Sequence, residues 1–264
     1  KSGKSTFLNA LFITLLLVRL PSELRVILID PKKVELTLYE GIAHVDKVIR
    51  NMDTAIDTLE KLTVEMDKRY EKMSEIGGVK NIVAYNRQSK TKLPYIIVAI
   101  DEYNDLKMTH PQVEDYVARL GQKARASGIH MIIATQTPNK DVIDNTIKTN
   151  LPSRISFKLD NNNEYKTVFG TGIPYRNLLG FGDGVVKYVG QTEEFIRFQA
   201  PVVTLDEVEE EETFENIKKA LKGEKVENKQ ETVGEVVEEN PIDKLKEIIL
   251  SKNETRVKEL QKEM

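Results

Sequence analysis

The first residues of the chain contain a pattern that could bind phosphate. Gly3, Lys4, Ser5 and Thr6 match the end of the loop pattern G-x-x-x-x-G-K-[ST], and the apolar run 7–18 that follows has helical spacing, as the motif requires. In such a loop the backbone N–H groups surround the phosphates, the lysine reaches the β and γ oxygens, and the serine hydroxyl binds Mg²⁺. The pattern therefore predicts four nucleotide-binding residues, among them a catalytic Lys4 and a metal-binding Ser5. Because the first glycine of the pattern would precede residue 1, we expect the chain to begin inside the loop; the alternative is a chance Gly-Lys-Ser before a helix.

Two adjacent carboxylates could supply the second half of such a site. Asp101 and Glu102 follow the apolar run 96–100, which predicts that they lie at the C-terminal end of a buried strand, where open α/β sheets bind ligands. Asp101 would hold Mg²⁺ directly or through water, and Glu102 would orient and deprotonate the attacking water. A lone Asp-Glu pair is commonly a solvated strand end, but a phosphate loop in the same chain favours the catalytic interpretation.

A third polar position follows another apolar run. The predicted strand 129–134 ends in Thr135 and Gln136, close to where a γ-phosphate would lie. Gln136 could sense whether that phosphate is present, or it could be an ordinary loop residue.

Three basic residues occupy the end of the helix predicted before that strand. Arg119, Lys123 and Arg125 could form a solvated basic face. They could also include an arginine finger, a guanidinium that stabilises the transition-state charge on the nucleotide of a neighbouring subunit.

Helices and strands alternate along the chain. We expect helices at 4–18, 52–76, 112–126 and 140–149, and strands at 25–30, 95–101, 129–134 and 154–159. Because the strands are almost wholly apolar, the pattern predicts an α/β fold with a mostly parallel sheet and helices on both faces. The strand inserted between the phosphate-loop helix and the Asp-Glu strand indicates the additional-strand class of ATPases rather than small GTPases.

Composition sets the domain organisation. The 264 residues suffice for one large domain and an appendage, and since the chain contains no cysteine it can form neither disulfides nor a cysteine-type zinc site. Residues 206–264 hold a clear excess of Asp and Glu, whereas residues 1–205 are mildly basic. We therefore expect an ATPase domain at 1–205 and an acidic, partly helical tail at 206–264, with helices near 213–221 and 241–263. The apolar run 7–18 is shorter than the roughly 20 residues that a membrane span needs.

Residues 1–203 resemble the FtsK/SpoIIIE DNA translocases, within the HerA-FtsK group of ring ATPases. Beyond the phosphate loop and Asp101-Glu102, the resemblance consists of short blocks in the same order. Among these blocks are Ile29-Asp30-Pro31-Lys32, Tyr39-Glu40-Gly41-Ile42, Glu65-Met66 with Arg69-Tyr70, Ala118-Arg119-Leu120, Gly128-Ile129-His130, Ala134-Thr135-Gln136, and Leu178-Leu179-Gly180 with Gly182-Asp183-Gly184.

The resemblance implies a RecA-like P-loop domain that moves double-stranded DNA with ATP and Mg²⁺. It implies a homo-oligomeric ring, expected to be a hexamer, and a cytoplasmic motor domain, with room for a membrane tether in a missing N-terminal region. Matched position by position, the family's site residues correspond to Lys4, Ser5, Asp101, Glu102, Gln136 and Arg125. Gln136 takes the sensor position, and Arg125 takes the finger position in preference to Arg119 or Arg154.

Two other functions are compatible with the same residues. One is a related secretion-type ATPase that moves protein substrates, which differs in that DNA would not stimulate its ATP hydrolysis. The other is a non-motor ATP-binding switch or scaffold, which would be a monomer indifferent to DNA and to loss of Arg125.

Overall fold

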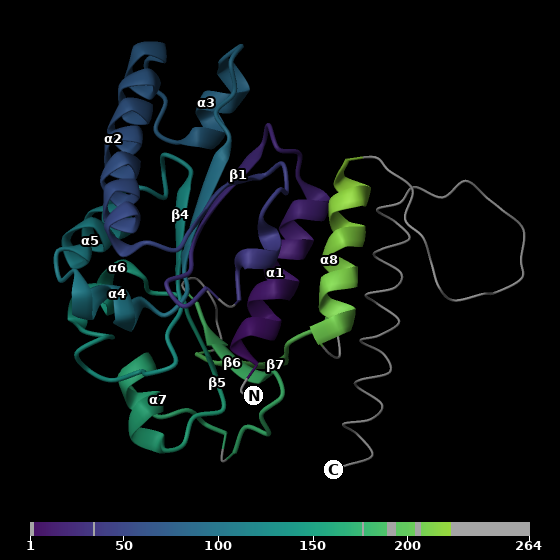
Figure 1. Cartoon of the computed structure of the whole chain (residues 1–264). Helices are drawn as coiled ribbons and strands as arrows, with labels where there is room; N and C mark the ends of the chain where they lie inside the picture. The colour runs from purple at the N-terminus through teal and green to yellow at the C-terminus, as the bar shows by residue number, and fades with distance from the viewer. Residues whose placement is uncertain (1–2, 34, 176, 189–193, 204–206, 223–264) are drawn as a thin grey trace, which may run out of the picture.

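A four-stranded parallel sheet forms the centre of the protein (Figure 1). The structure is a computed structural model that describes residues 3–33, 35–175, 177–188, 194–203 and 207–222. The strands lie in the order β2 (Val45–Ile49), β1 (Leu24–Ile29), β3 (Tyr95–Ile100) and β4 (Ile129–Ile133). Ile29 pairs with Ile100, and Ile100 pairs with Ile133, so the C-terminal ends of β1, β3 and β4 meet at one edge.

Helices cover both faces of this sheet, as the apolar strands predicted. The long ones are α1 (Lys4–Val18), α2 (Met52–Ile76) and α5 (Val113–Lys123). On β1, Ile27 and Ile29 pack in one core with α2 and α5, whereas Val26 and Leu28 pack in a second core with α1. Alternate side chains of a strand point to opposite faces, so a strand buried on both faces is apolar throughout.

The remaining helices are short apart from α8. They are the 3₁₀ turn η1 (Thr37–Tyr39), α3 (Ile82–Gln88), α4 (Tyr103–Thr109), α6 (Asn145–Asn150), α7 (Asn162–Phe169) and α8 (Glu207–Leu221). The helices predicted at 4–18 and 52–76 are confirmed by α1 and α2. The sequence did not predict β2, α3, α4 or α7, because each is short and carries little apolar periodicity.

A second, antiparallel sheet lies beside the N-terminal end of α1 (Figure 1). Its strands are β5 (Arg154–Phe157), β6 (Asp183–Lys187) and β7 (Ile196–Gln199), in that order. The strand predicted at 154–159 therefore exists, but its expected place in the parallel sheet was wrong. An apolar run identifies a strand without fixing the direction of its partner.

The acidic helix α8 packs against the core next to α1. Phe214 and Ile217 are buried, and the Phe214 ring meets the ring of the buried Tyr39 edge-on at 4.8 Å between centroids. Asn9 of α1 donates a hydrogen bond to Glu210 at 2.8 Å and accepts one from the Tyr39 hydroxyl at 2.9 Å. The tail helix predicted near 213–221 is thus present and longer, while the one predicted at 241–263 lies outside the described residues. Among the described helices, none is both long and apolar enough to cross a membrane.

Candidate nucleotide-binding site

Gly3 forms the start of the phosphate loop's helix. It caps α1 with φ of 116°, and its carbonyl accepts the hydrogen bond of the Phe7 N–H at 2.9 Å. A Cβ at this position would lie 2.4 Å from the Cα of Gly182, so only glycine fits. The first turn of α1 carries no acidic residue, which leaves its N–H groups and the positive end of the helix dipole for an anion.

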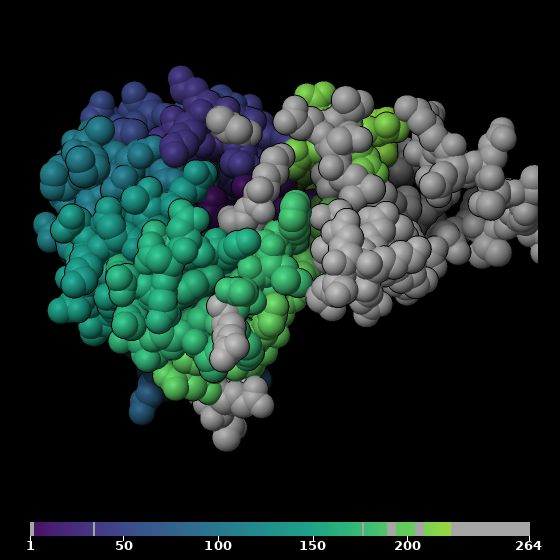
Figure 2. Space-filling model, turned by 90° about the horizontal axis from the view of Figure 1, so that it is seen from below, coloured from purple at the N-terminus to yellow at the C-terminus, as the bar shows by residue number. Residues whose placement is uncertain are grey.

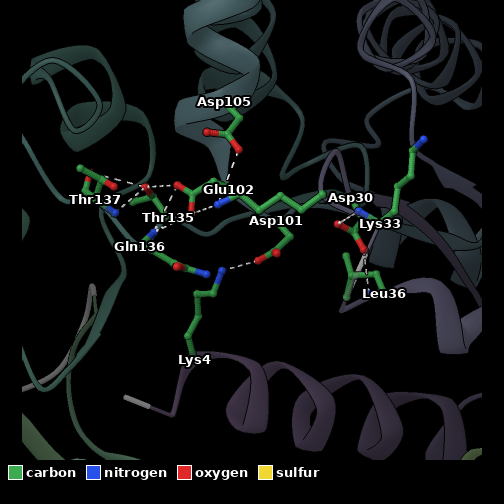
Figure 3. Close-up of polar contacts among 11 residues, drawn as sticks. Lys4, Asp30, Lys33, Leu36, Asp101, Glu102, Asp105, Thr135, Gln136 and Thr137 are labelled. Atoms are coloured by element: carbon green, nitrogen blue, oxygen red, sulfur yellow. Dashed lines mark hydrogen bonds and ion pairs between the residues drawn. The ribbon is translucent and has the colours of Figure 1, made fainter. Parts of the chain in front are cut away.

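Lys4 reaches across from α1 to the edge of the sheet. Its Nζ lies 2.5 Å from Oδ1 of Asp101, which directly follows β3 (Figure 3). The side chains are 15% and 2% exposed, so the pair is largely shielded from water. An ammonium and a carboxylate that lie 97 positions apart in the sequence therefore meet at the strand end.

Glu102 turns the other way, toward the end of β4. The Thr135 hydroxyl donates to Glu102 Oε1 at 2.7 Å, and the backbone N–H of Gln136 donates to Oε2 at 3.0 Å (Figure 3). Glu102 is 1% exposed and has φ of 59°, a left-handed conformation that non-glycine residues seldom adopt. Strained backbone of this kind clusters at functional sites, where the surroundings hold a side chain in one direction.

Lys32 adds a third contact to Glu102 that the sequence did not predict. Its Nζ lies 3.5 Å from Glu102 Oε2 and 3.6 Å from Oδ2 of Asp105 in α4. Slight burial opposes the charge of Lys32, but the carboxylates of Glu102 and Asp105 outweigh it and raise its pKa. Lys32 lies shortly after β1, and because β1 pairs with β3, the strand order brings Lys32 close to Glu102.

Ser5 and Thr6 occupy the first turn of α1, half-buried, at the wall of the same cavity as Lys4. The hydroxyl of Ser5 and the carboxylate of Asp101 are hard oxygen donors of the kind Mg²⁺ prefers. No group of three His, Asp or Glu side chains among the described residues could hold a metal ion.

Arg125 lies far from this edge of the sheet. It precedes β4, whereas Gln136 follows β4, and five strand residues separate the two edges by roughly 17 Å. The structure therefore brings together Lys4, Asp101, Glu102 and the backbone of Gln136, and leaves Arg125 at the opposite edge.

The other two arginines considered for the finger have partners within the chain. Arg119 pairs with Asp67 of α2 at 2.6 Å. Arg154 donates to the carbonyl of Lys148 and is half-buried, and this burial lowers its pKa.

A cavity of about 2000 Å³ runs along β4, between Arg125 at one end of the strand and Gln136 at the other. Its walls include Gly3 to Asn9 of the phosphate loop and α1, the strand and loop 129–138, the segment 150–160, and Phe181. Seen from below, purple atoms of the N-terminal segment lie in a hollow between teal and green atoms (Figure 2). The site is therefore open enough to admit a ligand.

A parallel sheet with a glycine-capped helix, a lysine and two carboxylates at its C-terminal edge defines the P-loop ATPase class. The FtsK/SpoIIIE family model matches residues 1–140. The chain belongs to the FtsK/SpoIIIE family.

Relatives and solved structures agree with this assignment. The DNA translocase FtsK of Clostridium acetobutylicum is 42% identical over 215 residues, covering 79% of this chain and 28% of that protein. The one from Helicobacter pylori is 41% identical over 213 residues, covering 78% of this chain and 25% of that protein. The chain thus spans less than a third of these relatives.

Two solved structures have the same fold. The conjugation coupling protein TcpA of pCW3, in a monomer form with ATPγS, is 28% identical with a TM-score of 0.63, over 75% of this chain and 57% of that one. EssC from Geobacillus thermodenitrificans, covering ATPases 2 and 3, has a TM-score of 0.70 at 22% identity, over 95% of this chain and 43% of that one. The EssC match concerns the fold alone.

Proposed function

We propose that this chain is the ATP-hydrolysing core of a motor that moves double-stranded DNA as a homo-oligomeric ring, with six subunits as the expected number. The contact of Lys4 with Asp101, beside Glu102 at the sheet edge, carries the proposal. The DNA substrate is supported by relatives about 40% identical that are named DNA translocases. Motor and substrates would meet in the cytoplasm.

The hydrolytic step would use the two carboxylates differently. Lys4 would leave Asp101 for the β and γ oxygens of ATP, and Ser5 and Asp101 would hold Mg²⁺, which when bound neutralises phosphate charge. Gly3 and Thr6 would contribute backbone N–H groups to the phosphates. Glu102 would orient the attacking water and accept its proton, since its carboxylate is already fixed by donors from the β4 loop.

Gln136 would report the γ-phosphate to Glu102. Its side chain is exposed at the cavity, while its backbone N–H binds the Glu102 carboxylate. If the Gln136 side chain moves toward or away from the γ-phosphate, its backbone N–H would move as well. That movement would change the hydrogen bond that holds Glu102, the proposed base.

Arg125 would act on a neighbour's nucleotide. Its position at the opposite edge of the sheet keeps it from its own chain's Lys4 and Asp101, which supports a role in trans and hence an adjoining subunit.

The test is ATP hydrolysis by the full chain with and without linear duplex DNA, at two salt concentrations, with Lys4→Ala as the matched inactive variant. We expect DNA to stimulate wild-type hydrolysis, and the stimulation to weaken at higher salt because phosphate contacts release counterions. Lys4→Ala should lose turnover under every condition. If duplex DNA does not change the rate of ATP hydrolysis, the proposed DNA motor is wrong. If Lys4→Ala hydrolyses ATP at the wild-type rate, the proposed site is wrong.

A further inference from the structure

The loop 180–184 before and into β6 touches the phosphate loop backbone to backbone. The Cα of Gly182 occupies the space that a Cβ on Gly3 would need. Phe181, the preceding residue, lines the same cavity as Gly3, Lys4 and Ser5. Phe181 therefore lines the cavity of the proposed phosphate-binding residues, and the residue that follows it packs against Gly3.

The backbone of Phe181 has a conformation that disfavours phenylalanine. Its φ is 50°, between Gly180 at 90° and Gly182 at 94°, so three consecutive residues have positive φ. Glycine would adopt this conformation without steric cost, yet the middle position carries a large aromatic side chain that is 55% exposed. A strained residue that contributes little to the core suggests a requirement other than stability.

Hydrogen bonds hold this strained backbone in place. Gln199 of β7 donates from Nε2 to the carbonyl of Phe181 at 2.9 Å. Asp183 accepts from the Leu179 N–H at 2.6 Å and from Arg197 Nη2 at 2.7 Å. The burial of Asp183 opposes its charge, but these donors lower its pKa, so the carboxylate stays ionised. The ring is thus carried by a preorganised loop, which reduces the entropy lost on binding.

We propose that Phe181 forms the base subsite for the nucleotide whose phosphates residues 3–6 hold, stacking on the base. The inference rests on the proposed function, because it takes the ligand to be a nucleoside triphosphate. Stacking uses the π-face that every base has, so Phe181 contributes affinity without choosing adenine over guanine.

Binding of ATP and of inorganic tripolyphosphate to the full chain separates base contacts from phosphate contacts. Phe181→Ala should weaken ATP binding about tenfold and leave tripolyphosphate binding unchanged, since stacking on a base is worth about that much. Phe181→Tyr keeps the ring and should bind ATP like wild type. Leu179→Ala is the control, because Leu179 is 47% exposed in the same segment but does not line the cavity.

Two further variants distinguish a loss of base stacking from misfolding. Phe181→Gly relieves the positive φ and should raise Tm by about 2–4 °C while weakening ATP binding as Phe181→Ala does. Because the chain has no tryptophan, Phe181→Trp supplies a single indole, whose fluorescence ATP should quench and tripolyphosphate should not.

Equal loss of ATP and tripolyphosphate binding in Phe181→Ala would overturn the base subsite, as would no loss at all. An effect of Phe181→Ala that appears only in oligomers would assign the ring to a subunit contact and also overturn it. These failures differ from failure of the proposed function, in which Lys4→Ala would leave the binding of both ligands intact.

Discussion

At the residue scale, Asp101 and Glu102 are neighbours in sequence with separate surroundings. Asp101 faces Lys4 of α1, and Glu102 faces Thr135 and Gln136 at the end of β4. The left-handed conformation at Glu102 turns the chain between them. Each carboxylate therefore has its own partners. This separation is compatible with the roles proposed for Asp101, which would bind the metal, and for Glu102, which would orient the water.

Thr135 provides the shortest hydrogen bond to Glu102, and its loss should affect turnover more than binding. Thr135→Val removes the hydroxyl at constant shape, so we expect kcat to fall about tenfold or more while KM for ATP changes little. Thr135→Ser restores the hydroxyl and should recover most of the rate. If kcat of the valine variant stayed at the wild-type value, Thr135 would not position Glu102.

The sequence predicts the chemical groups of the site, but not the contacts that hold them in place. Lys4, Asp101 and Glu102 belong to local motifs, which predicted that they share one site, whereas the direct contact of Lys4 with Asp101 was not predicted. The contacts of Thr135 and Lys32 with Glu102 depend on β1, β3 and β4 lying side by side, which no local pattern encodes. Gln136 was predicted through its side chain, whereas its observed contact to Glu102 is through the backbone.

At the element scale, α2 is fixed to the starts of two strands by one buried side chain. Arg69, 2% exposed, donates from Nη1 to the carbonyls of Pro94 and Ser127 at 2.9 Å each. Those carbonyls precede β3 and β4, and Glu65 of α2 pairs with Arg69 Nε at 2.8 Å. Arg69 therefore helps to fix the starts of β3 and β4, the two strands whose opposite ends carry the site.

Replacing Arg69 should destabilise the protein far more than replacing an exposed arginine. Arg69→Met leaves two carbonyls without their donor, and we expect the free energy of unfolding to fall by about 3 kcal/mol. Arg119→Met, at a residue whose side chain is 52% exposed in its pair with Asp67, should cost less than about 1 kcal/mol. Urea denaturation measures both, and equal losses would contradict the role given to Arg69.

Apolar periodicity predicted most long elements correctly and failed on edges and pairing direction. The helix at 52–76 was evident from its repeat and from Gly77, which ends it with φ of 75°. The edge strand β2 was missed because its side chains Asp46 and Lys47 are exposed. The strand β5 was found but joined to the wrong sheet, since its partner β6 lies about thirty residues later in the chain.

At the scale of the whole molecule, the first helix of the acidic segment belongs to the hydrophobic core. The burial of Phe214, Ile217 and Ala220 against the α1 side of the sheet was hidden by the surrounding glutamates. The composition of this segment predicts its acidic charge, but only the structure shows that its first helix packs against the core.

The proposed ring makes a separate prediction about Arg125. Arg125→Ala and Lys4→Ala subunits should each be inactive alone, because one lacks the finger and the other the phosphate contact. Mixing them should restore part of the ATPase rate, where a subunit with Arg125 adjoins one with an intact loop. Mixtures that stay as inactive as the separate variants would remove the role in trans.

We propose that Lys4, Asp101 and Glu102 act on one nucleotide and that its hydrolysis moves duplex DNA. The most direct measurement is displacement of a third strand from linear duplex DNA by the full chain, wild type against Glu102→Gln. We predict ATP-dependent displacement by wild type, and by Glu102→Gln normal ATP binding with displacement at least 100-fold slower. Displacement by Glu102→Gln at the wild-type rate would exclude the role of Glu102, and no displacement by wild type while it hydrolyses ATP would exclude a DNA motor.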